Sequence, residues 1–374
     1  MPTLYQKYRP QNFSDIIGQE HITQTITNEI TNNKLAHAYL FFGARGIGKT
    51  TIARLLAKSL NCENRKEKQA EPCNQCAACK DIKDGRHIDI IEIDAASHTG
   101  VDNVRENIIE NAQFRATKAK HKIFIIDEVH MLSTSAFNAL LKTLEEPPKQ
   151  VIFILATTEL HKLPATIISR CQRFNFKKIP YDDMKKRLKL ICDQEKIKVD
   201  KEVFDRIINK SDGCLRDAES LLGQILSLNL EKITTADIEI ILPTSNIENV
   251  LNFVDYVHNK ASKQALDTLQ NLISEGVNIE QFIYDTIEAL RFIMILKTDP
   301  TNNTLMVDYS EKDAKRIKKL VTDMDILQVI KMIESLIIKR TEVKSSPIPQ
   351  LPLELVVVEF MNQAGRKNTP AKAP

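Results

Sequence analysis

The chain has 374 residues, of which 43% are hydrophobic and 27% charged, and its net charge is +3. This length allows two or three domains, each with its own core, and the composition is that of an ordinary globular protein. So small a net charge does not by itself indicate nucleic-acid binding, which would have to come from local basic patches. The sequence contains no apolar run near the ~20 residues that span a bilayer and no apolar core of a signal peptide. We therefore expect a cytoplasmic protein whose seven cysteines are metal ligands or buried thiols, not disulfides.

The N-terminal 36 residues precede a glycine-rich loop and its strand. Residues 5–10 are expected to be extended or turn-like, and an amphipathic helix is predicted over 20–32. Because the loop follows directly, this segment is positioned to form a wall around the base and sugar of a nucleotide. The alternative is that Ile16 and Ile17 are simply core residues. The candidate nucleotide-binding residues of the segment are Tyr8, Arg9, Pro10, Ile17 and Gly18.

The stretch Gly43–Thr50 fits the pattern G-x-x-x-x-G-K-[ST] at every fixed position. It lies between an apolar run at 38–42, predicted to be a buried strand, and a helical pattern at 51–58. Backbone N–H groups and a helix N-terminus then point at phosphates, Lys49 reaches the β- and γ-phosphates and the Thr50 hydroxyl holds Mg²⁺. The alternative, a chance glycine turn before a helix, is disfavoured by the matching flanks. The candidate nucleotide-binding residues here are Gly43, Ala44, Arg45, Gly46, Ile47, Gly48, Lys49, Thr50 and Thr51.

Four cysteines lie in one insertion at about residues 60–82, namely Cys62, Cys73, Cys76 and Cys79. A closed tetrahedral Zn²⁺ site with four thiolates is the natural interpretation, and it would be structural because no coordination position stays open. An iron–sulfur cluster is an alternative, but the ferredoxin pattern requires a fourth cysteine three residues further on, ahead of a proline. Free thiols are the other alternative. The remaining three cysteines are scattered and are expected to be unliganded.

Two further strands are predicted at 88–93 and 122–128, and the second ends in the paired carboxylates Asp127 and Glu128. Asp127 is suited to hold the same Mg²⁺ as Thr50, and Glu128 to orient or deprotonate an attacking water. By itself this pattern is weak. In a chain of alternating strands and helices that already carries a glycine-rich phosphate loop, it indicates hydrolysis as well as binding.

The next predicted strand, 151–156, delivers Thr157 and Thr158 to the same edge, where a hydroxyl could reach a γ-phosphate or simply satisfy the strand end. A short helix after Pro164 ends at Arg170, and a last strand follows at 172–177. The alternation of strands and helices predicts an α/β fold with a parallel sheet. After residue 180 the strand patterns vanish, and the rest of the chain is predicted to be helical. Arg216 in the first turn of a helix is poorly placed for that helix and suggests a nearby anion, although Asp217 and Glu219 could also neutralise its charge.

These residues together resemble the gamma/tau subunit family of the bacterial DNA polymerase III holoenzyme, AAA+ ATPases that drive the sliding-clamp loader. The resemblance covers about residues 3–242 with high specificity and the helical remainder with low specificity. Besides the four cysteines, it is carried by residues 8–10, 17–19, 43–50, 94–97, 127–132, 144–148, 156–158, 169–171 and 213–218. The chain ends near residue 374 without the long C-terminal extension of the tau form, so it is most similar to the short, gamma-like form.

The resemblance implies roles that the residues alone do not. Arg170 would be an arginine finger that acts in trans on a neighbouring subunit's nucleotide. Thr157 would be sensor 1, and Arg216 would be sensor 2, which ties a helical lid to the γ-phosphate. The implied partners are delta- and delta-prime-like loader subunits, the sliding clamp and primer-template DNA, with ATP, Mg²⁺ and Zn²⁺ as cofactors. The family is part of a DNA-directed DNA polymerase, although this sequence carries no polymerase active site.

The expected domains are an AAA+ nucleotide-binding domain at 1–178, a helical lid at 179–242, a helical collar at 243–362 that oligomerises, and a disordered tail at 363–374. DNA would be held through its phosphates without sequence preference. The candidates for this contact are Ser97, His98 and Thr99 and the basic stretch 115–122, each of which could equally be a solvated surface. Two rival functions remain: a branch-migration motor of the same ATPase class, and a non-hydrolysing structural subunit of the loader.

Overall fold

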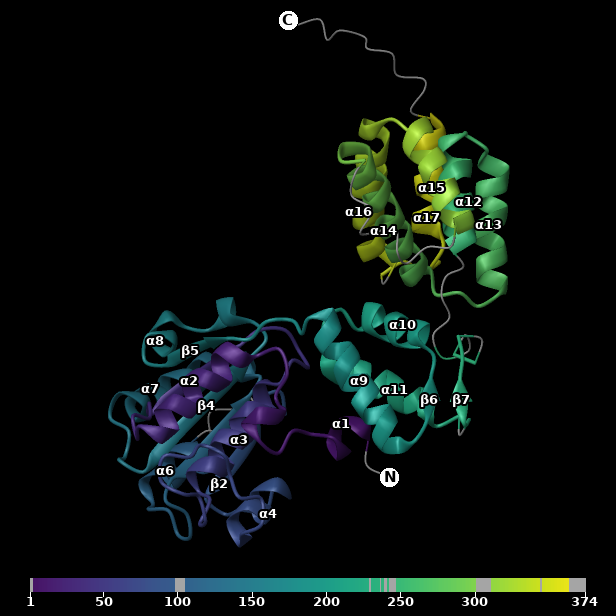
Figure 1. Ribbon diagram of the computed structural model, residues 1–374. Helices are drawn as coiled ribbons and strands as arrows, with labels where there is room; N and C mark the ends of the chain where they lie inside the picture. Colours follow the sequence, from purple (N-terminus) through teal and green to yellow (C-terminus); the bar gives the residue numbers. More distant parts are fainter. Residues whose placement is uncertain are drawn as a thin grey trace, which may run out of the picture. The chain divides into compact units, whose positions relative to one another are not determined.

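The computed structural model describes residues 3–97, 105–228, 230–235, 237–238, 241, 247–300, 311–343 and 345–362. It divides into two compact units, Met1–Ile241 and Leu242–Pro374 (Figure 1). Within the described residues, every helix is too short or too polar to cross a membrane. The candidate DNA residues His98 and Thr99 and the expected tail at 363–374 lie outside the described residues.

The first unit is built on a five-stranded sheet in the order β2-β3-β4-β1-β5, and every neighbouring pair is parallel. The register places Asp94 beside Asp127 and Phe42 beside Thr157. The carboxyl ends of four strands therefore meet at one edge, where ligands of open α/β sheets bind. The strands are β1 (Ala38–Phe42), β2 (Ile90–Asp94), β3 (Lys122–Asp127), β4 (Val151–Thr157) and β5 (Gln172–Asn175).

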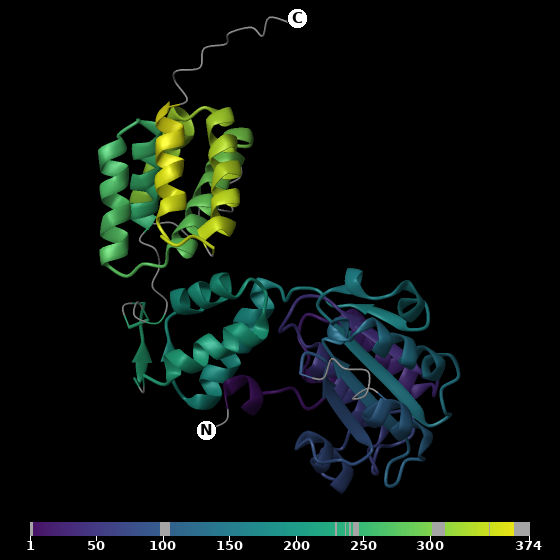
Figure 2. The same ribbon diagram turned by 180° about the vertical axis from the view of Figure 1, so that it is seen from behind.

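Helices cover both faces of this sheet, as the views from opposite sides show (Figures 1 and 2). Successive side chains of β3 alternate between two apolar clusters, because strand residues point to opposite faces. Ile123 and Ile125 pack with α2 and α3, whereas Phe124 and Ile126 pack with α7. The elements of these layers are α2 (Glu20–Thr31), α3 (Lys49–Leu60), η2 (Arg105–Glu110), α6 (Asn111–Gln113), η3 (Val129–Met131), α7 (Thr134–Glu145), η4 (Leu160–Lys162) and α8 (Ala165–Ile168).

The predicted α/β fold with a parallel sheet and a helical C-terminal region is confirmed. Several details differ from the sequence prediction, including the last strand, which ends at Asn175 and not at residue 177. The one-turn helix α1 (Leu4–Lys7) overlaps the segment 5–10 that was expected to be extended or turn-like. The Gln6 side chain accepts a bond from the Thr3 N–H at 3.3 Å. The second strand begins at residue 90 and not at 88, because His87 O accepts a turn bond from Ile90 N at 3.1 Å.

After the sheet, the first unit continues as a small helical region, with α9 (Tyr181–Glu195), α10 (Lys201–Ser211) and α11 (Leu215–Leu226). No strand was expected here, yet β6 (Lys198–Val199) pairs in parallel with β7 (Lys232–Ile233). Strands of two residues are too short to show an alternating pattern in the sequence, which is why they were missed. Ile233 is fully buried, so the pairing closes one side of the helical core.

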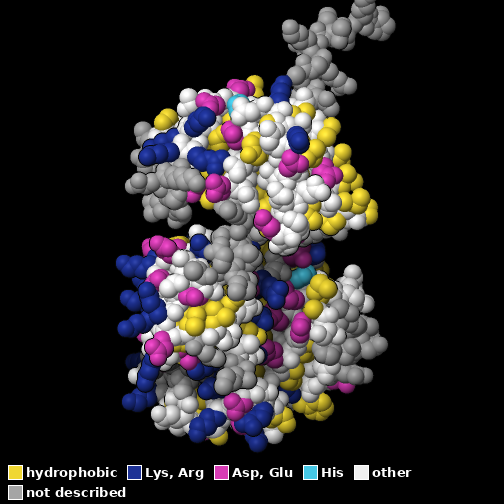
Figure 3. All heavy atoms as spheres, turned by 90° about the vertical axis from the view of Figure 1, so that its right-hand side faces the viewer, with side chains coloured by type: hydrophobic (Ala, Val, Ile, Leu, Met, Phe, Trp, Pro, Cys, Tyr) yellow, Lys and Arg dark blue, Asp and Glu magenta, His cyan; other side chains and the backbone are white. Residues whose placement is uncertain are grey.

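The second unit is a helical bundle around one apolar core, in which the rings of Phe253 and Phe282 lie edge to face at 5.5 Å. Several large apolar side chains are nevertheless exposed, and Figure 3 shows hydrophobic side chains gathered on one side of this unit. On α17, Leu351, Leu355 and Val358 recur on one helix face and are 37–47% exposed. The helices are α12 (Ile247–His258), α13 (Ser262–Ser274), α14 (Ile279–Thr298), α15 (Glu311–Asp323), α16 (Ile326–Val343) and α17 (Leu351–Asn362).

In the first unit, the buried carboxylate of Asp89 lies at the edge of the sheet opposite to the carboxyl ends of the strands. Only 1% exposed, it accepts backbone N–H bonds from Thr117, Lys118 and Ala119 at 2.8–2.9 Å. Burial alone would raise the pKa of Asp89, but these three donors hold it below the ordinary value of 3.8. The basic stretch 115–122 is therefore anchored at the edge away from the carboxyl ends, and its last residue, Lys122, is buried.

We expect Asp89→Asn to destabilise the first unit by about 2–3 kcal/mol, because an amide cannot accept three charge-assisted bonds. Since the folded-state pKa is lowered, the stabilisation is present above the ordinary carboxyl pKa and is lost as the pH falls through the folded value. Urea unfolding at pH 7 and in acid measures both effects, and the two proteins should converge in acid. The exposed Asp193→Asn is the control and should change stability by less than about 0.5 kcal/mol. Equal stability of the Asp89 variant at pH 7 would contradict the anchoring role.

Candidate functional site

The loop Gly43–Thr50 joins β1 to α3 at the carboxyl edge of the sheet. It approaches neighbouring segments so closely that two of its glycines are required. A Cβ on Gly43 would lie 2.4 Å from the Phe176 carbonyl oxygen, and one on Gly46 would lie 2.2 Å from Cys214 Sγ. Both glycines also have positive φ, +141° and +72°, which other residues rarely adopt. The loop is thus fixed against both the sheet and the start of α11.

Lys49 is the first residue of α3 and is only 6% exposed. Its Nζ donates to the carbonyl oxygens of Gly43 at 2.8 Å and Ala44 at 2.7 Å, so the ammonium group is folded back onto the loop. Burial lowers the pKa of Lys49, and the carboxylates of Glu128 and Asp127 oppose that shift. A buried cation beside a helix N-terminus is an arrangement that favours an anionic ligand.

Thr50 and Asp127 come together from elements 77 residues apart in the chain. The Thr50 hydroxyl donates to Asp127 Oδ2 at 2.7 Å. A hydroxyl and a carboxylate are oxygen ligands of the kind that Mg²⁺ prefers. The donor set therefore fits a magnesium ion between the loop and the end of β3.

Glu128 follows Asp127 in a left-handed conformation, with φ of +48°. Its carboxylate accepts bonds from the hydroxyl of Thr158 at 2.9 Å and from the Thr158 N–H at 3.2 Å. Thr157 is buried, and its Oγ1 lies 2.9 Å from Nδ1 of His130. His130 was not a predicted site residue. Its side chain is 6% exposed, and its ring nitrogens lie 3.4 Å from a Glu128 carboxylate oxygen and 3.3 Å from one of Glu159. Glu128 and Thr157 therefore belong to one polar network, joined by His130.

A cavity of about 550 Å³ opens beside the loop. Thirteen of the predicted site residues line it: Arg9, Pro10, Ile17, Arg45, Gly46, Ile47, Gly48, Lys49, Thr50, Thr51, Asp127, Glu128 and Arg216. Other predicted site residues do not line it: Tyr8, Gly18, Gly43, Ala44, Ser97, Thr157 and Arg170. Eight lining residues were not predicted as ligands: Tyr5, Asp15, Ile16, Asp94, Ala96, Arg187, Leu215 and Glu219. Ile16 lines the cavity and also packs against the core.

Arg187 and Glu219 are the most notable residues that the sequence prediction missed. They form an ion pair at 2.9 Å between α9 and α11, with side chains 8% and 6% exposed. Arg187 also donates to the Tyr8 carbonyl oxygen, which ties the N-terminal segment to both helices. Burial raises the pKa of Glu219, and Arg187 opposes the shift. The sequence did contain a signal for this pair. In each of the two helices, one charged residue interrupts an otherwise apolar stripe.

The two predicted arginines lie in different surroundings. Arg216 sits over the Tyr5 ring, 4.7 Å from its centroid, and its backbone N–H donates to the Gly46 carbonyl oxygen at 3.2 Å. Arg170 follows α8, donates to the Thr166 carbonyl oxygen at 2.7 Å and pairs with Glu145. Arg216 is therefore at the cavity of its own chain, and Arg170 is not.

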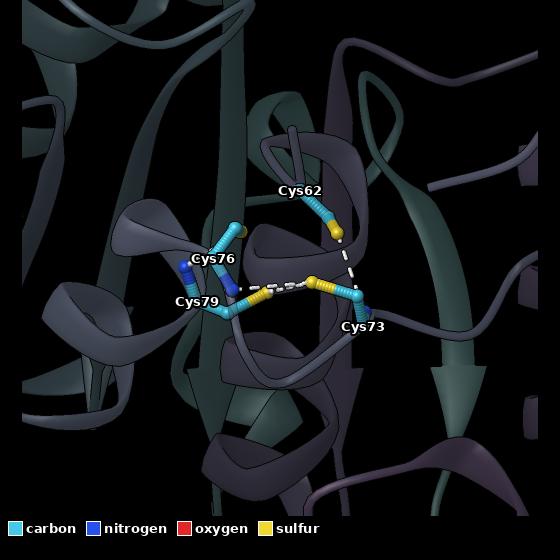
Figure 4. A group of neighbouring side chains, drawn as sticks. All are labelled: Cys62, Cys73, Cys76 and Cys79. Carbon is cyan, nitrogen blue, oxygen red and sulfur yellow. Dashed lines mark hydrogen bonds between the residues drawn. The ribbon is translucent and has the colours of Figure 1, made fainter. Parts of the chain in front are cut away.

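The four predicted cysteine ligands converge in the structure (Figure 4). Their Sγ atoms all lie within 4.8 Å of one another. Tetrahedral Zn–S bonds of about 2.3 Å place sulfur atoms ~3.8 Å apart, so the donor set fits zinc. Backbone N–H groups of Gln75 and Cys76 lower the pKa of Cys73 to about 6, which favours the thiolate. The cysteine module, residues 61–83 with helix α4 (Ala77–Lys83), thus has the donors of a closed metal site.

A parallel sheet, a glycine-rich loop and paired carboxylates at one edge define the class of P-loop α/β proteins. Comparison with known proteins gives the family. Residues 18–180 match the family model "DNA polymerase III, delta subunit", and residues 233–372 match "DNA polymerase III subunits gamma and tau domain III". The chain belongs to the DNA polymerase III gamma/tau subunit family, as its sequence resemblance indicated.

The sequences of two individual relatives agree with this assignment. The chain is 42% identical to DNA polymerase III subunit tau of Bacillus subtilis, over 96% of this chain and 62% of that protein. It is 38% identical to subunit gamma of Buchnera aphidicola, over 96% of this chain and 98% of that protein. It thus spans about three-fifths of the tau relative. A solved DNA clamp loader delta protein of B. subtilis has a TM-score of 0.38 and 12% identity, covering 91% of this chain and 99% of that one.

Proposed function

We propose that this chain is an ATP-hydrolysing motor subunit of a bacterial DNA polymerase III clamp loader, which acts in the cytoplasm to load the sliding clamp onto primed DNA. The observation that carries this proposal is the meeting of Thr50 and Asp127 at 2.7 Å in a cavity lined by the glycine-rich loop. This pair accounts for holding the metal ion of a bound nucleotide, and Glu128 beside it is the residue that favours hydrolysis. A hydroxyl and a carboxylate poised for one metal ion beside Glu128 are the parts that phosphoryl transfer requires.

The candidate catalytic residues have defined parts in this proposal. Lys49 moves from its loop carbonyls to the β- and γ-phosphates of ATP, and Thr50 and Asp127 hold Mg²⁺, which neutralises charge on the phosphates. Glu128 leaves Thr158 to orient the attacking water. Thr157, as sensor 1, acts through the network that contains Glu128 and His130. Arg216 reaches the γ-phosphate from the start of α11, and Arg170 completes the site of a neighbouring subunit.

The four module cysteines would hold a structural Zn²⁺. Zinc with four thiolates is closed to substrate and supplies folding energy, not chemistry. The module is a short insertion with few apolar residues, so a metal is a suitable source of its stability.

The rest of the chain serves assembly in this proposal. Residues 1–178 form the AAA+ domain, 179–242 the lid and 243–362 a collar. The exposed apolar residues of α16 and α17 then contact delta- and delta-prime-like subunits, since exposed apolar patches mark protein interfaces. Primer-template DNA is held by its phosphates, with Ser97 and the basic stretch 115–122 as the described candidates.

The test is the ATPase rate of the purified chain alone, with partner loader subunits, and with clamp plus primed DNA. We expect the rate to rise with assembly and to rise again with clamp and primed DNA. Stimulation by four-way DNA junctions, but not by clamp, would instead support a branch-migration motor. ATP binding with no hydrolysis under any of these conditions would instead support a structural subunit of the loader.

A further inference from the structure

The cysteine module contacts the N-terminal segment close to the point where that segment borders the cavity. The Glu71 carboxylate accepts the backbone N–H of Phe13 at 2.8 Å and that of Ser14 at 2.9 Å. These are the first two N–H groups of the turn η1 (Phe13–Asp15), which have no acceptor within the turn itself. One carboxylate therefore satisfies two backbone donors through charge-assisted bonds.

A second contact runs in parallel with the first. The Asn74 side-chain amide donates to Asn12 Oδ1 at 2.7 Å. Asn12 in turn donates to Asp15 Oδ2 from its backbone at 3.1 Å and from its side chain at 3.2 Å. Asp15 lines the cavity, as do Ile16 and Ile17 after it. The module is thus connected to the cavity wall through two successive polar contacts.

Both contacting residues flank a cysteine of the metal site. Glu71 lies two residues before Cys73 and Asn74 lies directly after it, with φ of +60°. Phe13, 4% exposed, belongs to the same buried cluster as Ala70. The backbone around Cys73 therefore has to hold one conformation for the polar and the apolar contacts to form together.

We propose that the cysteine module holds the wall of the nucleotide cavity, with Glu71 and Asn74 as positioning residues, and that nucleotide affinity and metal retention are coupled through residues 12–15. This inference rests on the proposed function, because it takes the cavity to bind a nucleotide. Coupling between two sites is reciprocal, so bound nucleotide must strengthen metal retention by the factor by which metal strengthens nucleotide binding.

The first measurement is the dissociation constant of ADP for the full chain, determined by calorimetry. Glu71→Gln should weaken ADP binding by about fivefold or more, since couplings of this kind are typically of that size. Glu67→Gln is the matched control: it makes the same change at an exposed residue of the same module and should leave the affinity unchanged. If Glu71→Gln fails to fold, Asn74→Gly replaces it, because glycine readily adopts the left-handed φ of this turn and lacks the side chain that contacts Asn12.

The second measurement is the release of zinc to a colorimetric chelator, with and without saturating ADP. ADP should slow the release from the wild-type chain and from Glu67→Gln, and this protection should be lost in Glu71→Gln. A merely structural role would lower thermal stability and leave both the ADP affinity and the ADP protection unchanged. Wild-type ADP affinity in both Glu71→Gln and Asn74→Gly, or zinc release from the wild-type chain that ADP does not alter, would overturn the coupling. If the wild-type chain binds no ADP, the proposed nucleotide site is wrong, and the proposed coupling is then wrong as well.

Discussion

Replacement of Lys49 by methionine or alanine is expected to weaken ATP and ADP binding by about 10- to 100-fold or more. In the structure the ammonium group is held by two loop carbonyl oxygens, 2.7 and 2.8 Å away. In the bound state, a charged oxygen of the β- or γ-phosphate would replace these neutral carbonyl acceptors. A charge-assisted bond is worth about 1.5–3 kcal/mol, and each 1.4 kcal/mol is a factor of ten. Loss of the charge in a water-poor site adds to that figure.

The stability of the Lys49 variants separates lost binding from lost folding. Burial lowers the pKa of Lys49, which means that the charged form is disfavoured in the folded protein without a ligand. Lys49→Met keeps the length of the side chain and removes this cost, so the melting temperature of the nucleotide-free chain should stay constant or rise. Fluorescent-nucleotide titration and thermal melting test both points. A folded methionine variant with wild-type ATP affinity would show that the loop does not bind phosphate.

Much of the site was predictable because its determinants are local in the sequence. The loop Gly43–Thr50 and the flanking apolar runs form a strand, a turn and a helix from neighbouring residues, and the structure has them where they were expected. Asp127 and Asp94 share an edge because parallel strands align their carboxyl ends. Convergence of the four cysteines was also predictable, since short spacing leaves few alternatives. The motifs that carried the family resemblance are also short runs of neighbouring residues.

The contacts that were missed join segments far apart in the chain. Arg187 and Glu219 lie 32 residues apart on different helices, and only the packing of α9 against α11 brings them to one cavity. Glu71 reaches Phe13 and Ser14 across 57–58 residues. The apolar stripes of α9 and α11 mark Arg187 and Glu219 as charged residues on a buried face, but periodicity does not say that the two side chains meet. A charged residue in a loop, such as Glu71, is ordinarily solvated, so its contact gave no signal at all. Likewise, only the folded chain shows that the Cys214 side chain lies against Gly46.

Arg170→Ala is expected to leave the ADP affinity of the isolated chain unchanged and to lower the ATPase rate of the assembled loader by about 10³-fold or more. Arg170 does not line the cavity of its own chain, and its side chain is one-third exposed beside Glu145. The guanidinium is thus available to a neighbour. An arginine that stabilises the transition-state charge of phosphoryl transfer from another subunit contributes 10³- to 10⁵-fold.

The control for Arg170 is Arg173→Ala, which removes an exposed arginine from β5 three residues further on and should leave every rate unchanged. Loader assembly, followed by gel filtration, must be intact in both variants, because Arg170 lies at the surface through which it would act. The decisive comparison is between the isolated and the assembled protein. If Arg170→Ala weakens ADP binding or slows any basal hydrolysis of the isolated chain, the residue acts within its own subunit and the site is not composite. If the loss occurs only after assembly, the arginine completes the site of its neighbour, and hydrolysis depends on the ring.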